Sequence, residues 1–186
     1  MIWRLSTVCM IIRMKGIIGK ALAILFCCIL IRLFVGELCY ISSDSMNPTL
    51  QTGDWVWLDK MSYGALLPNR FAEIPLFNVF TWLSSLRDID KKNNWNYHRT
   101  IGFGKPKVGD IIVFRDKQKD DRLLVKRVTH KKEGNELCSY YVMGDNRTNS
   151  IDSRFYGEIP DYLIVGKVRL VLFSTKSWKR FFKLVG

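Results

Sequence analysis

Histidine is scarce in this sequence, in which His98 and His130 are the only two among 186 residues. The zinc-binding motifs CxxC and HExxH are both absent, and protein zinc sites are built from closely spaced ligands of this kind. Each histidine stands beside basic residues, so we expect both at the surface. The sequence therefore predicts no metal site and gives poor support for a Ser-His-Asp triad.

Acidic residues are also few. There are 17 aspartates and glutamates against 29 lysines and arginines, which gives a formal net charge of +12. Such an excess favours a polyanionic neighbour, either nucleic acid or an anionic lipid bilayer. We find no internal repeat, no zinc-finger spacing and no RNA-binding aromatic signature. The length is sufficient for one domain with a full core, and one domain is favoured over two.

None of the five cysteines belongs to a spacing that requires a disulfide bond. Cys27 and Cys28 fall inside a long apolar run, where thiols act as small hydrophobes. Cys39 and Cys138 are the candidates for pairing in an oxidising compartment. Since no spacing demands this pair, we expect free thiols.

A long apolar run lies near the amino terminus. Residues 21–40 read "ALAILFCCILIRLFVGELCY", the length that a helix needs to cross the hydrocarbon layer. Arg32 and Glu37 interrupt its second half. Starting the span at Ile17 moves Arg32 towards one face of the membrane, where its long side chain can reach the interface. We expect a single transmembrane helix over residues 17–40.

A cleaved signal peptide is the alternative interpretation of this run. It would need an apolar core of about 7–15 residues followed by a small-residue cleavage site, and "GELCYISS" supplies no such site. We therefore favour a retained anchor. Basic residues precede it, so residues 1–16 are predicted to stay in the cytoplasm, and residues 41–186 to form a domain on the far side of the membrane.

The rest of the chain shows mostly strand-like patterns. In "GDWVWLDK" (53–60) a Gly-Asp turn leads into alternating residues, with Trp55 and Trp57 on one face and Val56 and Leu58 on the other. Four other segments have a similar strand-like character: 108–116, 122–130, 139–146 and 163–173. Five strand candidates predict a mainly β domain on a helical anchor.

Two further segments contain apolar residues outside these strands. The run "IPLFNVFTWLSSL" (74–86) is too short to span a bilayer, and we expect it to pack on the core rather than dip into the membrane. The carboxyl-terminal segment 174–186 mixes aromatic residues with four cations. For this segment a solvated end and a membrane-surface contact are both open.

Candidate nucleophiles follow the anchor directly. The stretch "ISSDSMNPTL" (41–50) holds three serines within four residues, and a serine hydroxyl needs a base within hydrogen-bond reach before it attacks a carbonyl. With both histidines among cations, a lysine that has lost its proton is the better base. Its pKa, about 10.4 in water, must fall by roughly 2 units, and burial among apolar neighbours produces such a shift.

One lysine has a suitable context. In "RLLVKRVTH" (122–130) the two-residue period of a strand places Leu124, Lys126 and Val128 on one face. Lys126 therefore shares its face with two hydrophobes. A lysine within a strand is more often found at a sheet edge or facing solvent, so the pattern leaves that alternative open.

The segment "MGDNRTNSIDSRFYGEIP" (143–160) has the glycines and asparagines of tight turns. It also contains two aspartates and two arginines that can form charge pairs to fix its shape: Asp145, Arg147, Asp152 and Arg154. An ordinary polar loop is the alternative interpretation.

Together these segments resemble bacterial type I signal peptidases, which are membrane-bound serine peptidases with a Ser-Lys dyad. "SDSMNPTL" resembles the family's nucleophile box, "VKRV" its lysine box and "GDNRTNSIDSR" its glycine-aspartate-asparagine-arginine box. The boxes occur in the family's order, and the predicted anchor precedes the first of them. The resemblance implies an antiparallel β-sheet catalytic domain whose active site lies near the membrane surface.

The resemblance also implies the chemistry. Ser45 would be the nucleophile and Lys126 its general base. The backbone N–H of Ser45 and the hydroxyl of Ser43 would form the oxyanion hole. No cofactor is implied. The substrates would be exported precursor proteins, cut after a small-x-small motif such as Ala-x-Ala.

Three further residues would support this site. Ser150 would orient the lysine amine, while Asp152 and Arg154 would brace the surrounding segment. The implied location is the bacterial cytoplasmic membrane, with membrane lipids as partners and no role for nucleic acid.

Some positions depart from the family pattern. Ser42 stands where a proline is usual, and Asp44 where a glycine is usual. The stretch between Lys126 and Ser150 is short, which predicts a compact form without the accessory β region of larger members. A peptidase specialised for one substrate, such as those of conjugative transfer, is one alternative. A basic membrane-tethered protein that binds nucleic acid or anionic lipid without catalysis is another.

Overall fold

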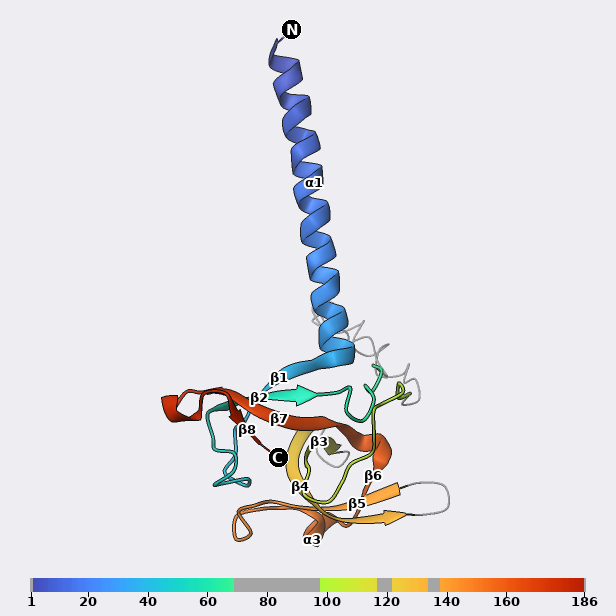
Figure 1. Cartoon of the computed structure of the whole chain (residues 1–186), viewed down its shortest axis with the longest axis vertical. Helices are drawn as coiled ribbons and strands as arrows, with labels where there is room; N and C mark the ends of the chain where they lie inside the picture. Colours follow the sequence, from blue (N-terminus) through green and yellow to red (C-terminus); the bar gives the residue numbers. More distant parts are fainter. Residues whose placement is uncertain (1, 69–97, 117–121, 134–137, 186) are drawn as a thin grey trace, which may run out of the picture.

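The computed structural model describes residues 2–68, 98–116, 122–133 and 138–185, the first twelve of them by their backbone only. A long helix projects from one side of a β domain and does not lie along its sheet (Figure 1). The predicted core-packing run 74–86 lies outside the described residues.

The helix consists of α1 (Ile2–Leu30) followed by the π-helical turn η1 (Ile31–Val35). Its segment Met14–Val35 has a mean hydropathy of 2.4, and none of it is buried against the protein. Among the described residues this is the one helix long and apolar enough to cross a membrane. An apolar helix without a protein partner is typical of a membrane-spanning segment.

The helix is shorter at its carboxyl end than the predicted span 17–40. The last five residues of the predicted span form the strand β1 (Gly36–Tyr40) instead. This strand pairs antiparallel with β2 (Asp54–Asp59). A Cβ atom at Gly36 would lie 2.4 Å from the carbonyl oxygen of Leu58, so only glycine permits this close approach. Pairing with β2 supplies the backbone hydrogen bonds that a continued helix would otherwise provide.

The two charges that interrupt the apolar run meet at this junction. The Nε atom of Arg32 lies 3.3 Å from Oε2 of Glu37, and Nζ of Lys60 lies 3.3 Å from Oε1 of the same carboxylate. Lys60 also donates to the carbonyl oxygen of Arg32 at 3.0 Å. Glu37 is thus paired at the base of the helix instead of standing alone within the span.

The β domain is one antiparallel sheet in the order β1-β2-β7-β3-β4-β5-β6, with β8 paired to β7. All five predicted strands are confirmed, as β2, β3 (Ile111–Asp116), β4 (Arg122–Glu133), β5 (Cys138–Met143) and β7 (Ile164–Ser174). The shorter elements are α3 (Ser153–Tyr156), β6 (Ile159–Pro160), η4 (Asp161–Leu163), η5 (Trp178–Arg180) and β8 (Lys183–Leu184). The mainly β, antiparallel fold class is therefore confirmed.

Strand β3 separates two hydrophobic cores. Ile111 and Val113 pack into one core with β2 and β7, whereas Ile112 and Phe114 pack into the other with β4, β5 and η4. Because successive residues of a strand point to opposite faces, a strand buried on both faces reads as a continuous apolar run. The alternation in β2 is also as predicted, with Val56 and Leu58 fully buried.

Cys39 and Cys138 are free thiols.

The carboxyl-terminal segment returns to the start of β2. The guanidinium of Arg180 lies 2.6 Å from the carboxylate of Asp54, and both side chains are buried. Arg180 also donates to the carbonyl oxygen of Thr49 at 2.8 Å. Burial alone raises the pKa of Asp54, but hydrogen bonds from Arg180 and the Gln51 backbone outweigh burial and lower it. This charge pair ties the tail to the segment before β2.

We predict that Asp54→Ala lowers the free energy of unfolding by about 3–5 kcal/mol, because it leaves the buried guanidinium of Arg180 without its counter-ion. Denaturant unfolding in detergent measures the change. The matched control is Lys132→Ala, which removes an ion pair from the surface and should change stability by less than about 1 kcal/mol. Equal effects of the two substitutions would contradict the structural role of the Arg180–Asp54 pair.

Candidate active site

Ser45 lies in the loop that joins β1 to β2. Two backbone hydrogen bonds close this loop, from Ile41 N to Asp54 O and from Gly53 N to Ile41 O, each at 2.9 Å. Next to Ser45, the side chain of Met46 is buried in the first core. The serine itself is half-buried, and its buried neighbour holds it in place.

Lys126 lies near the centre of β4, directly opposite Ile112 of β3. It is only 3% exposed, and Leu124 and Val128 on the same face pack into the second core. Its Nζ atom lies 2.7 Å from the Oγ atom of Ser45. The fold thus brings together the predicted serine and lysine from distant parts of the chain. Lys126 is at neither the sheet edge nor the solvent-facing side.

The surroundings of Lys126 favour its neutral form. Burial lowers the pKa of its amine below the ordinary value of lysine, since a charge is poorly solvated there. The carboxylate of Asp152 acts in the opposite direction and raises it, while the guanidinium of Arg154 lowers it further. Burial is the largest of the three effects, and the net shift is downward.

A second serine hydroxyl lies beside the first. The Oγ atoms of Ser43 and Ser45 are 3.4 Å apart, at the long end of hydrogen-bond distances. The carboxylate of Asp44 accepts a hydrogen bond from the Thr52 hydroxyl at 2.7 Å. The side chain of Asp44, which stands between the two serines, is therefore hydrogen-bonded to Thr52.

His98 and His130 are both exposed, as predicted.

The segment after β5 holds the serine loop from the other side. The Asn146 backbone N–H donates to the carbonyl oxygen of Ser45 at 3.0 Å, and its side-chain amide donates to that of Asp44 at 3.2 Å. A Cβ atom at Gly144 would lie 2.5 Å from the Ser45 carbonyl oxygen and 2.2 Å from Oγ of Ser150. The sequence indicated a tight turn at these two positions but not their contact with the serine loop.

Asp152 and Arg154 form the charge pair expected within this segment. The carboxylate of Asp152 is fully buried and accepts from Nε of Arg154 at 2.8 Å and from Gly144 N at 2.9 Å. Burial alone raises the pKa of Asp152, but these hydrogen bonds outweigh burial and lower it well below its ordinary value. Arg154 further donates to the carbonyl oxygens of Arg147 and Ser150, at 2.8 and 3.2 Å. The pair therefore binds the whole turn to one buried carboxylate.

Ser150 is buried beside Gly144, close to this pair. Its Oγ atom has no well-aligned hydrogen-bond partner among the described residues, although its proximity to Asp152 contributes to the lowered pKa of that carboxyl. The structure thus places the predicted Ser150 in the site region without showing a bond from its hydroxyl to the lysine amine.

Asp145 pairs with an arginine outside its own segment, not with Arg147 or Arg154. Its carboxylate pairs with Arg127 of β4 through two contacts of 2.8 Å, to Nε and to Nη2. Arg127 also donates to Gly109 O at 2.8 Å and to the Thr49 hydroxyl at 3.4 Å. Arg127 follows Lys126 and points to the opposite face, so strand β4 supplies the candidate base on one face and a clamp on the other.

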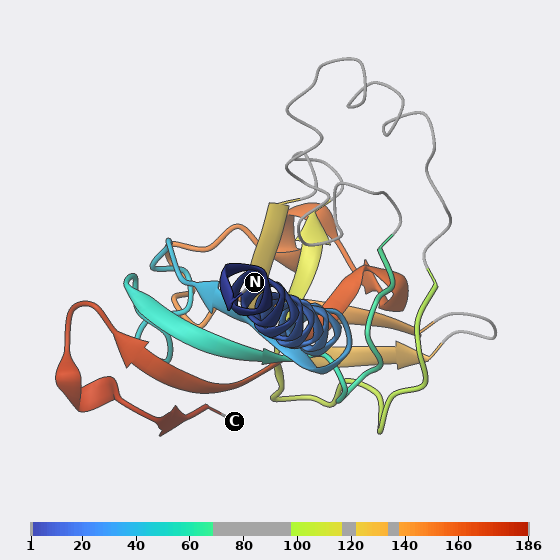
Figure 2. The same ribbon diagram turned by 90° about the horizontal axis from the view of Figure 1, so that it is seen from above.

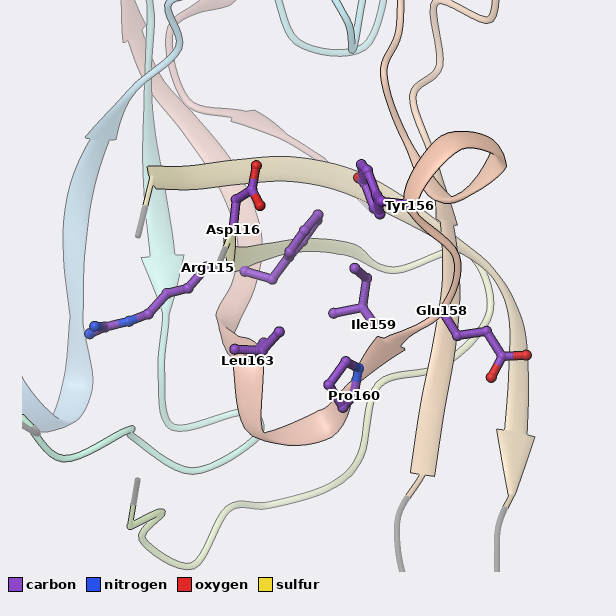
Figure 3. Close-up of a pocket in the computed structure, with 8 residues that line it drawn as sticks. Arg115, Asp116, Tyr156, Glu158, Ile159, Pro160 and Leu163 are labelled. Carbon is purple, nitrogen blue, oxygen red and sulfur yellow. The ribbon is translucent and has the colours of Figure 1, made fainter. Parts of the chain in front are cut away.

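A separate small pocket of about 110 Å³ lies between β3, α3 and η4 (Figure 3). Ile159 and Leu163 are among the apolar side chains that line it, and Asp116 and Glu158 are among the charged ones. None of the six predicted site residues lines this pocket.

Within the described parts of the chain, no three histidine, cysteine or acidic side chains form a group able to hold a metal ion.

A serine hydroxyl in contact with a buried lysine amine is the arrangement of Ser-Lys hydrolases, in which the lysine replaces the usual histidine. Comparison with known proteins agrees with this class. The family model described as signal peptidase, peptidase S26, matches residues 14–130 and 136–173. This chain belongs to that family.

Several curated relatives are similar over most of the chain. A probable signal peptidase I-2 of Synechocystis sp. is 32% identical over 148 residues, which are 74% of this chain and 63% of the relative. A probable signal peptidase I-1 of the same organism is 32% identical, over 81% of this chain and 78% of the relative. The signal peptidase I of Bacillus caldolyticus is 29% identical, over 74% of this chain and 80% of the relative. The chain thus spans less than two thirds of the first of these relatives.

We predict that Asp152→Asn shifts the titration of Lys126 to lower pH, because the substitution removes the carboxylate that raises the pKa of the amine. NMR of ¹³C-methylated lysines across pH measures the shift. The matched control is Glu133→Gln, which removes an exposed carboxylate at the end of the same strand and should leave Lys126 unchanged. A rise in the Lys126 pKa in the Asp152 variant would contradict this electrostatic account.

Proposed function

We propose that this protein is a membrane-bound serine endopeptidase that removes signal peptides from exported precursor proteins, with Ser45 as nucleophile and Lys126 as general base. The single observation that carries the proposal is the 2.7 Å contact between Oγ of Ser45 and the amine of a buried lysine. Membership of the signal peptidase family supports the substrate class. Cleavage after a small-x-small motif is the specificity that we expect.

The first half of the reaction forms an acyl-enzyme. The neutral amine of Lys126 takes the proton of the Ser45 hydroxyl as Oγ attacks the carbonyl carbon of the scissile peptide. The carbonyl oxygen becomes a tetrahedral oxyanion. When this intermediate collapses, the C–N bond breaks and the lysine ammonium gives its proton to the departing amine. The signal peptide then remains attached to Ser45 as an ester.

The second half repeats these transfers with water. The lysine, neutral again, takes a proton from a water molecule that attacks the ester carbonyl. Collapse of the second tetrahedral intermediate breaks the ester C–O bond, and the proton returns to Oγ of Ser45. The lowered pKa of Lys126 suits this role, because a base must be unprotonated at the working pH.

The oxyanion needs hydrogen-bond donors close to Ser45. The backbone N–H of Ser45 and the hydroxyl of Ser43, 3.4 Å from Oγ of Ser45, are the donors that we assign to it. Losing one such donor typically costs about 10²–10³ in rate. Asp152 and Arg154 brace the turn, and the buried hydroxyl of Ser150 is the group that we assign to orient the lysine amine.

The anchor contributes by position. The loop that carries Ser45 begins directly after β1, and β1 begins directly after the helix. Ser45 is therefore tied by a short segment to the proposed membrane span. A precursor held in the same bilayer by its own signal peptide meets the enzyme at a raised effective concentration. We place residues 1–16 in the cytoplasm and the β domain on the extracytoplasmic side of the bacterial cytoplasmic membrane.

We predict that Ser45→Ala and Lys126→Met each reduce precursor cleavage by a factor on the order of 10⁴–10⁶, since each removes one member of a pair that acts as a unit. Ser43→Ala should cost only about 10²–10³. Cleavage of a precursor in detergent measures the three rates. Lys132→Met, an exposed lysine on the same strand as Lys126, is the matched control and should retain full activity. Cleavage at the wild-type rate by the first two variants would rule the mechanism out.

We also predict an acidic limb in the pH–rate profile, with kcat/KM rising as Lys126 loses its proton. Because burial lowers the pKa of this amine, the limb should have its midpoint below the ordinary value for lysine, about 10.4. Activity is lost as the pH falls through that midpoint, since the protonated amine cannot accept the serine proton. In the Asp152→Asn variant the midpoint should move to lower pH. A profile that is flat down to pH values where only carboxylates titrate would exclude a lysine base.

A further inference from the structure

One acidic side chain next to the candidate nucleophile has no cationic partner. In this chain of formal net charge +12, most carboxylates that the structure describes lie against a lysine or an arginine. Five aspartates form such ion pairs within 3.0 Å: Asp54, Asp59, Asp110, Asp145 and Asp152. Asp44, which stands between the two site serines, forms no ion pair with any described residue. Its negative charge is therefore left without a neutralising cation from the described part of the protein.

The carboxylate of Asp44 is nevertheless held in place. The backbone carbonyl oxygen of Asp44 accepts from Asn47 N at 3.1 Å and from the side-chain amide of Asn146 at 3.2 Å. Its Oδ1 atom accepts from the Thr52 hydroxyl at 2.7 Å. The residue is exposed, and among the described residues no donor is bound to Oδ2. The fold thus presents one carboxylate oxygen to the solvent beside the site.

Asp44 also lies close to the reacting atoms. It joins Ser43 to Ser45, whose Oγ atoms are 3.4 Å apart, and neighbouring Cα atoms are separated by only about 3.8 Å. Figure 2 shows the serine loop, in light blue, at the edge of the domain beside the orange segment that follows β5. A substrate whose scissile carbonyl lies at the two serines therefore places its flanking residues within side-chain reach of Asp44.

The residues before the cut leave little room for a substrate cation at this carboxylate. In the small-x-small motif that we expect, the first and third residues before the cut are small. The residue between them points away from the enzyme, because successive side chains of an extended chain alternate in direction. The two residues after the cut have no such restriction. A lysine at either of these positions has a long, flexible side chain that can bring its ammonium to Asp44.

We propose that Asp44 is a specificity-determining residue that selects precursors with lysine or arginine at the first or second position of the mature protein. The inference rests on the proposed function, since it assigns a further substrate preference to the same site. A carboxylate near the oxyanion opposes the negative charge that develops there. A substrate cation bound to Asp44 relieves this repulsion, so the preference is expressed in kcat/KM.

The test compares precursors that differ only by lysine against glutamine at the first or at the second position after the cut, cleaved by the full chain in detergent. The measured quantity is the ratio of kcat/KM for the lysine precursor to that for the glutamine precursor, so a variant of lower overall activity is equally informative. We expect wild type to favour lysine by about two- to fivefold at low salt, as for an exposed ion pair. Added salt should reduce this preference.

Two substitutions at position 44 test the role of the charge. Asp44→Asn keeps an oxygen that can accept from the Thr52 hydroxyl and should abolish the preference. Asp44→Lys should reverse it, so that the glutamine precursor is cleaved faster. The matched control is Glu133→Gln, which changes the net charge by the same amount as Asp44→Asn but at the exposed end of β4. This control should keep the wild-type ratio.

Three results would overturn the assignment. These are equal kcat/KM for the lysine and glutamine precursors at both positions in wild type, a preference that survives Asp44→Asn, and an equal loss of preference in Asp44→Asn and Glu133→Gln, which would show a general effect of net charge. A wild-type protein that cleaves no precursor of either kind would instead refute the proposed function, and this inference with it. The two failures are therefore distinguishable.

Discussion

The contact between a serine hydroxyl and a lysine amine excluded from water is the constraint on which the rest of the structure depends. An isolated ammonium ion is expensive to bury, so a lysine in such a place tends to become neutral. The flanking hydrophobes of β4 and the paired strand β3 create this environment for Lys126. The amine then meets Oγ of Ser45. The lowered pKa of this amine is thus a consequence of sheet packing.

Three arginine–carboxylate pairs fasten segments that adjoin the serine loop. Arg154 with Asp152 holds the turn after β5, Arg127 with Asp145 joins that turn to β4, and Arg180 with Asp54 attaches the tail. Arg127 and Arg180 both donate to Thr49, four residues after Ser45. The buried charges among them, Asp54, Asp152 and Arg180, are all paired and hydrogen-bonded, as buried ions must be.

The sequence predicted the strands well because their signals are local. A two-residue alternation, or an apolar run bounded by turns, is visible within six to twelve residues, and β2, β3, β4, β5 and β7 all have such patterns. The end of the helix was placed five residues too late. Hydropathy alone does not distinguish the last turn of a helix from the strand Gly36–Tyr40, whose pairing partner β2 lies further along the chain. Among the charge pairs, Asp152–Arg154 is close in sequence and was anticipated, whereas Asp145–Arg127 crosses between segments and was not.

By itself the sequence determined the apolar helix and the mainly β character, because hydropathy and period carry that information. The six candidate site residues were predicted from the resemblance of three sequence motifs to those of the signal peptidase family. Only the tertiary structure decided which of these residues meet. The alternation in β4 put Lys126 on an apolar face, but burial depends on β3 and β5, which pack beside it. The outward aromatic side chains of the tail were likewise decided by packing, since Arg180 and Val185 occupy the inner positions. Periodicity is local, whereas exclusion of water is a property of the assembled sheet.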